Sequence, residues 1–219
     1  MEKGQGSIGY KVYMQLRDDI TLGLFKPGEH LSEKLLTQKY GVSRTLTREV
    51  IRQLAAEGYL SFEPNRGAIV TKLTLQDVDV TYNILLRCEA YAAGLFAKCG
   101  NEIVIKKLVA LHKKMKEKNV TLDYRIWLGK NDEFHKLIYT NCGNSALSDF
   151  IHHTRLRIYR FRIVRTKIKV MDSCNNEHRK MLSAIRDKNG KRVEKLMANH
   201  LDIARKRRLE IIRQFSSFL

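Results

Sequence analysis

Two histidines flank a tight turn near the end of this 219-residue sequence. His178 and His200 lie ten to twelve residues either side of the middle of "DKNG" (187–190), so a helical hairpin would bring them to one level, about 16 Å from the turn. Asn131 and His135, at i and i+4, share the inward face of an earlier predicted helix. Each histidine taken alone is better explained as a hydrogen-bonded core residue. Together, the four residues favour a site for a divalent metal such as Zn²⁺ or Ni²⁺.

Three arginines suggest a second kind of chemistry. Arg44, Arg48 and Arg52 are spaced i, i+4 and i+8, so on a helix they form one slowly drifting stripe. Such a stripe is usually a solvated face, and only its surroundings can favour another interpretation. Ser43 is a good N-cap directly before the stripe, and Gly58 ends the helix. We interpret this helix as one whose basic face contacts phosphates and base edges.

The elements around the arginine helix support that interpretation. Apolar residues at helical spacing predict a helix over residues 8–22, which the Gly and Pro residues of "GLFKPGEHL" then break. A short helix between Ser32 and Gly41 follows, and only a Gly-containing turn separates it from the arginine helix. After the arginine helix, "YLSFEPNRGAIVTKL" predicts a β-hairpin with Arg66 and Gly67 at its tip. This order predicts a winged helix-turn-helix.

The stretch from residue 10 to residue 72 resembles the DNA-binding domain of the GntR family of bacterial transcription regulators, through "PGEHLSE", "GVSRTLTRE" and "NRG". The resemblance implies a homodimer that places one recognition helix in each half-site of a palindromic double-stranded DNA operator. Arg52 is assigned to a backbone phosphate or to solvent, because it has drifted around the helix. The positions that match DNA contacts of the family are Lys34, Ser43, Arg44, Thr45, Arg48, Arg66 and Gly67.

The rest of the chain is predicted to be all helical, because it contains no Pro and no strand-like alternation. Its predicted breaks leave about six helices, which suit an antiparallel bundle. The expected fold is therefore mainly α, with a winged helix-turn-helix over 1–72 and a helical effector-binding and dimerisation domain over 73–219. The predicted breaks lie at 99–102, 119–121, 141–145, 170–176 and 187–190.

"NDEFHKLIYTNCGNSAL" and "EHRKMLSAIRDKNGKRVEKLMANHL" resemble the FCD ligand-binding domain, the FadR-type effector module of the same family. Metal-binding members of that family use an Asp or Asn four residues before a His, followed by two further His. Those positions match Asn131, His135, His178 and His200, with Asp132 as an alternative ligand about a quarter-turn off the inward face. The resemblance implies a metal that serves effector binding and structure, with open positions for a small organic acid.

Arginines on two predicted helices are candidates for binding an anionic effector. Arg155, Arg162 and Arg165 lean toward the inward face of one helix, although a solvated face explains each of them better when it is taken alone. Many relatives carry a clamp arginine where this chain has Leu85, and Arg87 lies nearby. The predicted effector-binding residues are therefore Arg87, Arg155 and Arg162.

The net charge of +18 favours an anionic partner, but its distribution does not identify the DNA reader. Residues 1–72 hold 11 Lys and Arg against 8 Asp and Glu, whereas residues 73–219 hold 30 against 15. The basic second segment leaves a nonspecific nucleic-acid-binding protein as an alternative. No apolar run approaches the ~20 residues that span a bilayer, and the first residues lack the apolar core of a signal peptide, so a cytoplasmic protein without membrane partners is expected.

The four cysteines are scattered, without a CxxC pair, and are expected to be reduced packing residues without chemistry. The main hypothesis is a sequence-specific transcriptional regulator, a repressor by family habit, that is controlled by a small carboxylate-bearing effector at or near a metal. An enzymatic alternative is a metal-dependent hydrolase that uses the histidine cluster. The absence of HExxH, a P-loop and a paired nucleophile and base argues against any enzyme.

Overall fold

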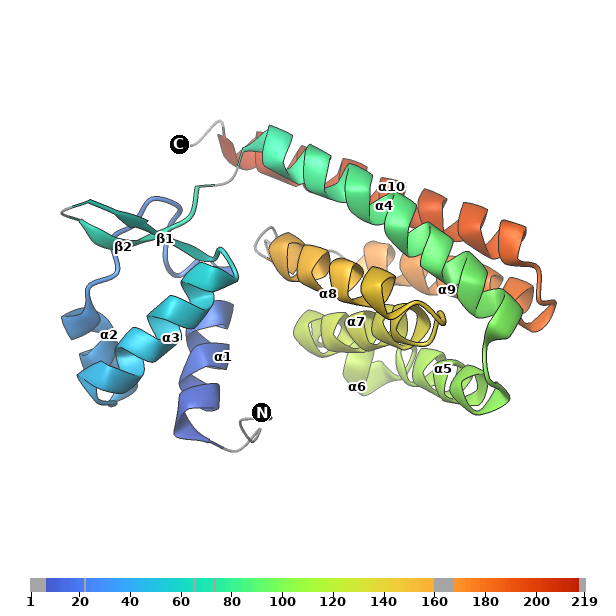
Figure 1. Ribbon diagram of the computed structural model, residues 1–219, viewed down its shortest axis with the longest axis horizontal. Helices are drawn as coiled ribbons and strands as arrows, with labels where there is room; N and C mark the ends of the chain where they lie inside the picture. Colours follow the sequence, from blue (N-terminus) through green and yellow to red (C-terminus); the bar gives the residue numbers. More distant parts are fainter. Residues whose placement is uncertain (1–6, 22, 65, 73, 160–167, 217–219) are drawn as a thin grey trace. The chain divides into compact units, whose positions relative to one another are not determined.

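The computed structural model describes residues 7–21, 23–64, 66–72, 74–159 and 168–216. The chain forms two compact units (Figure 1). One unit holds the chain up to Thr74, and the other holds Leu75–Arg155 together with the chain from Val164 onward. The described part is mainly helical with a small two-stranded sheet, as the sequence predicted.

The first unit has the element order of a winged helix-turn-helix (Figure 1). The two strands are antiparallel, with Leu60 opposite Val70 and Glu63 opposite Gly67, so they form the predicted hairpin. Its elements are α1 (Ile8–Thr21), α2 (Glu33–Tyr40), α3 (Arg44–Ala56), β1 (Leu60–Glu63) and β2 (Gly67–Val70).

Local capping explains where α2 and α3 begin and how the turn between them forms. The side chain of Ser32 accepts a hydrogen bond from the backbone N–H of Leu35 at 3.1 Å, and Ser43 accepts one from Leu46 at 3.3 Å. Gly41 ends α2 with a φ of 64°, a left-handed conformation that favours glycine. These three residues fix the short turn that sets the direction of α3.

The buried face of α3 anchors it to the rest of the first unit. Helices α1 and α2 and the sheet contribute Leu16, Leu36 and Leu60 to the same core. Burial of one α3 face leaves the opposite face of this helix to solvent. The buried residues of α3 are Thr47, Val50, Ile51 and Leu54, as predicted.

The second unit is an all-helical bundle in the described residues, in which the two longest helices, α4 and α10, lie side by side and antiparallel (Figure 1). Among the helices that the structure describes, none is long and apolar enough to cross a membrane. The helices are α4 (Leu75–Cys99), α5 (Glu102–Lys114), α6 (Lys118–Thr121), α7 (Tyr124–Thr140), α8 (Ser145–Tyr159), α9 (Ile168–Arg186) and α10 (Gly190–Ser216).

The predicted break at 170–176 was wrong, because α9 is helical throughout that stretch. Ser, Asp and Asn there have weak helix preference, but contacts with other helices override it. Asn175 is buried, and its Oδ1 accepts a hydrogen bond from Trp127 Nε1 at 3.3 Å. The predicted break at 119–121 is occupied by the single-turn helix α6, so the described part of this unit has seven helices rather than about six.

Two glycines allow α4 and α10 to approach closely. A Cβ built on Gly190 would lie 2.7 Å from the carbonyl oxygen of Gly94, and one on Gly94 would lie 3.2 Å from the carbonyl oxygen of Gly190. A backbone oxygen cannot move aside as a flexible side chain can, so a side chain at Gly190 does not fit. This approach fixes the start of α10 against α4.

Candidate metal centre and DNA-reading surface

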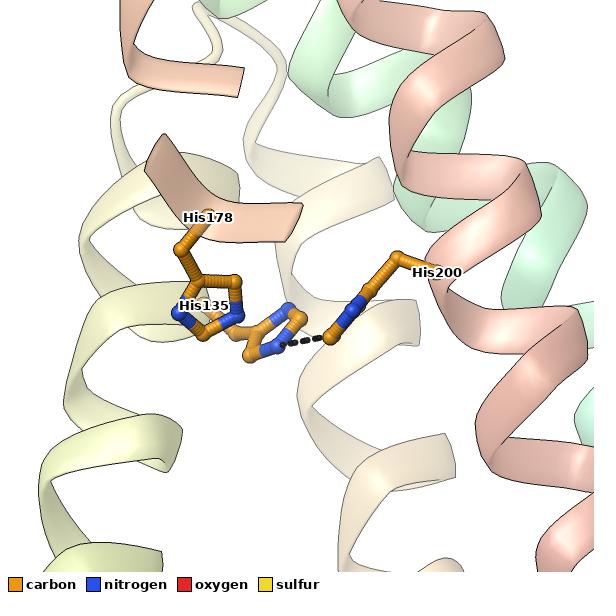
Figure 2. A group of neighbouring side chains, drawn as sticks. All are labelled: His135, His178 and His200. Atoms are coloured by element: carbon orange, nitrogen blue, oxygen red, sulfur yellow. Dashed lines mark hydrogen bonds between the residues drawn. The ribbon is translucent and has the colours of Figure 1, made fainter. Parts of the chain in front are cut away.

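Three buried histidines from three helices converge in the second unit, and Figure 2 shows their rings turned toward one another. They are His135 of α7, His178 of α9 and His200 of α10. One nitrogen from each ring lies within 4.8 Å of the others. The ring centroids of His178 and His200 are 4.9 Å apart, so the two residues do meet at one level of the α9–α10 hairpin.

Apolar packing holds the rings in place. On α9, His178 shares its buried face with Met181 and Ile185, so the packing that buries α9 also turns the imidazole inward. Phe134 stacks on the ring of His178 with centroids 4.0 Å apart and an interplanar angle of 7°. The rings therefore stay oriented because their surroundings are close-packed.

Two carboxylates bind the outer nitrogens of two of these rings. Glu89 of α4 is bonded to His135 Nδ1, and Glu177 of α9 is bonded to His200 Nδ1 at 2.6 Å. With both Nδ1 atoms held, the Nε2 atoms of His135 and His200 face each other at 3.2 Å, the contact dashed in Figure 2. Carboxylates that orient histidines in this way are typical of the surroundings of metal sites.

Both carboxylates are ionised at neutral pH. Burial alone would raise the pKa of Glu89, but the charge of Arg155 and the contact with His135 outweigh it and lower that pKa to about 2. Burial also acts to raise the pKa of Glu177, and the hydrogen bond with His200 brings it below its ordinary value. An ionised carboxylate can only accept a hydrogen bond, so each bonded Nδ1 carries a proton and donates it.

Two Nε2 atoms that can serve as metal ligands face each other. Burial and the charge of Arg155 lower the pKa of His135 to about 4, so its ring is neutral at pH 7 and Nε2 holds a lone pair. Nδ1 of His200 donates to Glu177, so Nε2 is the nitrogen of His200 that faces His135 and can bind a metal. A cation between the two Nε2 atoms could be coordinated by both rings. Two nitrogen ligands of one Zn²⁺, each at 2.0–2.1 Å, lie about 2.8–3.4 Å apart, a range that includes the observed 3.2 Å.

His178 also has a nitrogen that can bind a metal. Figure 2 shows its Nε2 on the side of His135 and His200, whereas its Nδ1 lies on the far side of the ring. Burial and the neighbouring His200 hold the pKa of His178 well below its ordinary value, so this ring is neutral. A neutral imidazole is the form that binds metals, so His178 can act as a third ligand.

The two residues predicted as oxygen ligands, Asn131 and Asp132, have different hydrogen-bond partners. Asn131 is half-buried on α7, and its Oδ1 is 3.5 Å from the Sγ of Cys174, which donates to it. Asp132 accepts a hydrogen bond from Arg155 Nη2 at 3.3 Å. Asp132 thus pairs with an arginine, and the structure does not place it in the histidine group.

Of the three predicted effector-binding arginines, the structure describes Arg87 and Arg155. Arg155 is buried, and its Nη1 donates to both oxygens of Glu89 at 2.9 and 2.7 Å, so this guanidinium is already bound to protein carboxylates. Arg87 is exposed, and it lies about 200° around α4 from the buried Glu89, so its role in effector binding stays a prediction. Arg162 and Arg165 lie outside the described residues.

The exposed face of α3 carries the predicted DNA-contact side chains. Arg44, Thr45, Arg48 and Arg52 are all exposed, opposite the buried face. Arg48 Nε donates to both carboxylate oxygens of Glu33 on α2 at 2.8 Å, which ties the guanidinium to the preceding helix. Lys34 is exposed on α2, and Ser43 is used as the N-cap of α3.

The wing tip holds the remaining predicted contacts. Arg66 is exposed, and its Nη1 donates to Glu63 at 2.9 Å across the turn. Gly67 has a φ of 77°, and a Cβ built on it would lie 3.4 Å from His30 Nε2. A side chain at Gly67 would therefore be both strained and crowded.

Sequence reasoning missed both carboxylates of the histidine cluster, Glu89 and Glu177. Glu177 directly precedes His178 on α9. It contacts His200 on the next helix instead. An acidic residue next to an inward histidine was the available signal, but its partner depends on how α9 and α10 pack.

Comparisons with known proteins agree with both halves of this description. The model of the bacterial regulatory proteins, gntR family, matches residues 9–70, and the model of the FCD domain matches residues 81–203. The HTH-type transcriptional regulator YdhC of Bacillus subtilis is 31% identical over 196 residues, which cover 87% of this chain and 86% of YdhC. The HTH-type transcriptional repressor RspR of Escherichia coli is 24% identical over 198 residues, which cover 89% of this chain and 86% of RspR.

A solved structure supports the fold. The structure of E. coli McbR/YncC superposes with a TM-score of 0.76 at 19% identity, over 97% of this chain and 99% of that one. At this identity the likeness concerns the fold alone. The matching families and the relatives named above are transcriptional regulators and not enzymes, so the hydrolase alternative is set aside.

Proposed function

Because the chain belongs to the GntR family of bacterial transcriptional regulators and carries an FCD effector-binding domain, we propose that it is an effector-controlled repressor that binds a palindromic operator as a homodimer. The capped helix α3 supports this, since its buried face fixes it in the unit and its other face presents Arg44 and Arg48 to solvent. Arginine side chains on an exposed helix can read guanine edges and phosphates in a major groove.

A divalent metal, Zn²⁺ or Ni²⁺, held by His135, His178 and His200 is the second part of the proposal. It is carried by the 3.2 Å approach of two Nε2 atoms whose rings both donate through Nδ1 to carboxylates. Imidazole ligands suit both metals. When bound, the metal would supply a Lewis-acid anchor for the carboxylate of a small organic acid, because three protein ligands leave a position open.

Arg155 acts as a positioning residue in this account. Both of its terminal nitrogens are bound to protein carboxylates, Glu89 and Asp132. It keeps Glu89 ionised, and Glu89 in turn orients His135. The positive charge that attracts the effector therefore comes from the metal rather than from Arg155.

The homodimer is supported by an exposed apolar stripe on α4. Val80, Ile84 and Tyr91 lie on one face of the helix and are 50%, 43% and 52% exposed. Apolar side chains gathered on one exposed face commonly mark a protein–protein contact. Effector binding would favour one arrangement of the two subunits over another, and this would raise or lower the affinity of the dimer for its operator.

A footprinting experiment tests the DNA-binding part. Arg48→Ala should abolish protection of the DNA upstream of the protein's own gene, whereas Arg186→Ala, which removes an exposed arginine on α9, should leave it intact. Native mass spectrometry should report a dimer for both variants. Undiminished protection by Arg48→Ala would overturn the assignment of α3 as the recognition helix.

A further inference from the structure

Helix α5 presents a face of lysines to which neither the DNA-reading helix nor the metal site gives a role. One side of α5 is buried in the second unit. The residues on that side are Ile105, Leu108, Leu111 and His112. At about 100° per residue, the four lysines of the helix fall within an arc of about 120° on the opposite side. All four are exposed, and together they form the α5 lysine face: Lys106, Lys107, Lys113 and Lys114.

The α5 lysine face is not neutralised by the part of the chain that the structure describes. Elsewhere in this unit, basic side chains have carboxylate partners, such as Lys206 with Asp202 at 2.8 Å. No lysine of the face forms an ion pair with a described carboxylate, although Glu102 lies four residues before Lys106. Residues 102–118 hold six lysines against two glutamates. A solvated helix face commonly mixes the two signs, so an unpaired face of one sign favours a polyanionic partner.

We propose that the α5 lysine face is a second DNA-contacting surface, which binds the phosphate backbone of duplex DNA without reading its sequence. The choice of DNA as the polyanion rests on the DNA-binding function proposed above. Each lysine is a compact positive charge, without the planar fork that gives arginine its bidentate recognition. Lys106 and Lys113 are seven residues apart, about 10 Å along the helix, which is close to the rise of about three base pairs. The face is therefore long enough to contact several phosphates at once.

An anionic bilayer is the main competing partner, and the packing of α5 argues against it. A helix that lies in a membrane surface buries its apolar side among the lipids. The apolar side of α5 is already buried in the protein, through residues such as Leu108 and Leu111. Ile103 is 62% exposed, but one isoleucine cannot replace an apolar helix face. The lysines can thus bind a polyanion from solution without any rearrangement of the helix.

Binding to unrelated duplex DNA tests the proposal. The full-length protein is titrated into a labelled random-sequence duplex of about 60 base pairs at several salt concentrations, and fluorescence anisotropy gives the affinity and its salt slope. We expect a variant with glutamine at all four positions of the face to bind at least about 10-fold more weakly at low salt. Its salt slope should fall by about 3, because each phosphate contact contributes about 0.9. The variant carries Lys106→Gln, Lys107→Gln, Lys113→Gln and Lys114→Gln.

Two further variants separate the arrangement of the lysines from their charge. Four exposed lysines of α7, α9 and α10 are replaced by glutamine in the matched control, which loses the same net charge and should bind as the natural protein does. Its substitutions are Lys136→Gln, Lys180→Gln, Lys191→Gln and Lys195→Gln. Arginine at all four positions of the face keeps the charge and the helix propensity, so this variant should also bind normally.

The outcomes distinguish this inference from the proposed function. Equal losses in the glutamine variant of the face and in the control, or no loss in either, would overturn the role of the face. The operator footprint that Arg48→Ala is expected to abolish would still stand in that case. Loss of binding to phosphatidylserine vesicles with unchanged duplex binding would assign the face to a membrane and overturn the proposal. A natural protein that binds no duplex would overturn both the inference and the DNA-binding function.

Discussion

The Nε2 atoms of His135 and His200 lie 3.2 Å apart although each ring already donates through Nδ1 to a carboxylate. Because both Nδ1 atoms are held by carboxylates, both Nε2 atoms are left to face each other in the core. Two imidazole nitrogens at this separation match two ligands of one Zn²⁺.

Removing the carboxylate behind one ligand should weaken metal binding. Glu177→Gln takes away the anion that holds His200 Nδ1, and loss of such a supporting group typically costs about 10–100-fold in affinity. Competition with a chelating dye measures the change. Glu133→Gln, an exposed position on α7, is the matched control and should bind as the natural protein does. Equal affinities for the two variants would contradict the role of Glu177.

The metal-free protein should lose stability in acid. The pKa of His135 falls from 6.5 to about 4 on folding, so between these values the unfolded chain binds more protons than the folded one. The free energy of unfolding should therefore fall as the pH is lowered from about 6.5 toward 4. Glu89, with its pKa lowered to about 2, adds a further loss below about 4.5.

Urea unfolding between about pH 4.5 and about pH 7, with chelator present, measures this dependence, because that range covers most of the interval between the lowered pKa of about 4 and the ordinary value of 6.5. His153→Asn, an exposed position on α8, should show the same slope as the natural protein. A midpoint that stays constant or rises on acidification would show that His135 is not buried in its neutral form.

Two glycine substitutions should change the free energy of unfolding in opposite directions. Gly190→Ala drives a Cβ to 2.7 Å from a backbone oxygen of α4, and overpacking of this kind costs about 1–3 kcal/mol. Gly129→Ala meets nothing within 4 Å in the exposed middle of α7, so it should gain up to about 1 kcal/mol from helix propensity. Thermal unfolding of the two variants measures both. Destabilisation by Gly129→Ala as large as by Gly190→Ala would refute the close approach of α4 and α10.

Lys34 should contribute charge without sequence information. Lys34→Ala is expected to weaken binding to operator and to unrelated DNA alike, and to lower the salt slope of binding by about 1. Fluorescence anisotropy at several salt concentrations gives the slope. Lys180→Ala, an exposed position on α9, should not change it. A larger change for Lys180→Ala than for Lys34→Ala would favour a nonspecific nucleic-acid binder.

Features that depend on neighbouring residues were predictable from the sequence. The N-cap at Ser43 and the left-handed stop at Gly41 act within one turn of chain, so their residue types reveal them. The meeting of His178 and His200 was also predictable, because it needs only a turn and the rise per residue of a helix.

Features that depend on residues far apart in sequence were not predictable from the sequence. Helix α9 continues through 170–176 because Asn175 bonds to Trp127 and to the carbonyl oxygen of Met115, and both lie far away in sequence. The surroundings of Cys174 were not predictable either. Its neighbour Asn131 comes from another helix, and only the packing of α7 against α9 brings the two together.

The most direct test of the central claim is the metal content of the purified full-length protein after incubation with Zn²⁺ and removal of free metal. Elemental analysis combined with native mass spectrometry should find one zinc ion per chain in the natural protein. His178→Ala should lose it, and His153→Ala, which removes an exposed histidine, should retain it. No zinc in the natural protein, or equal zinc in His178→Ala, would contradict the account.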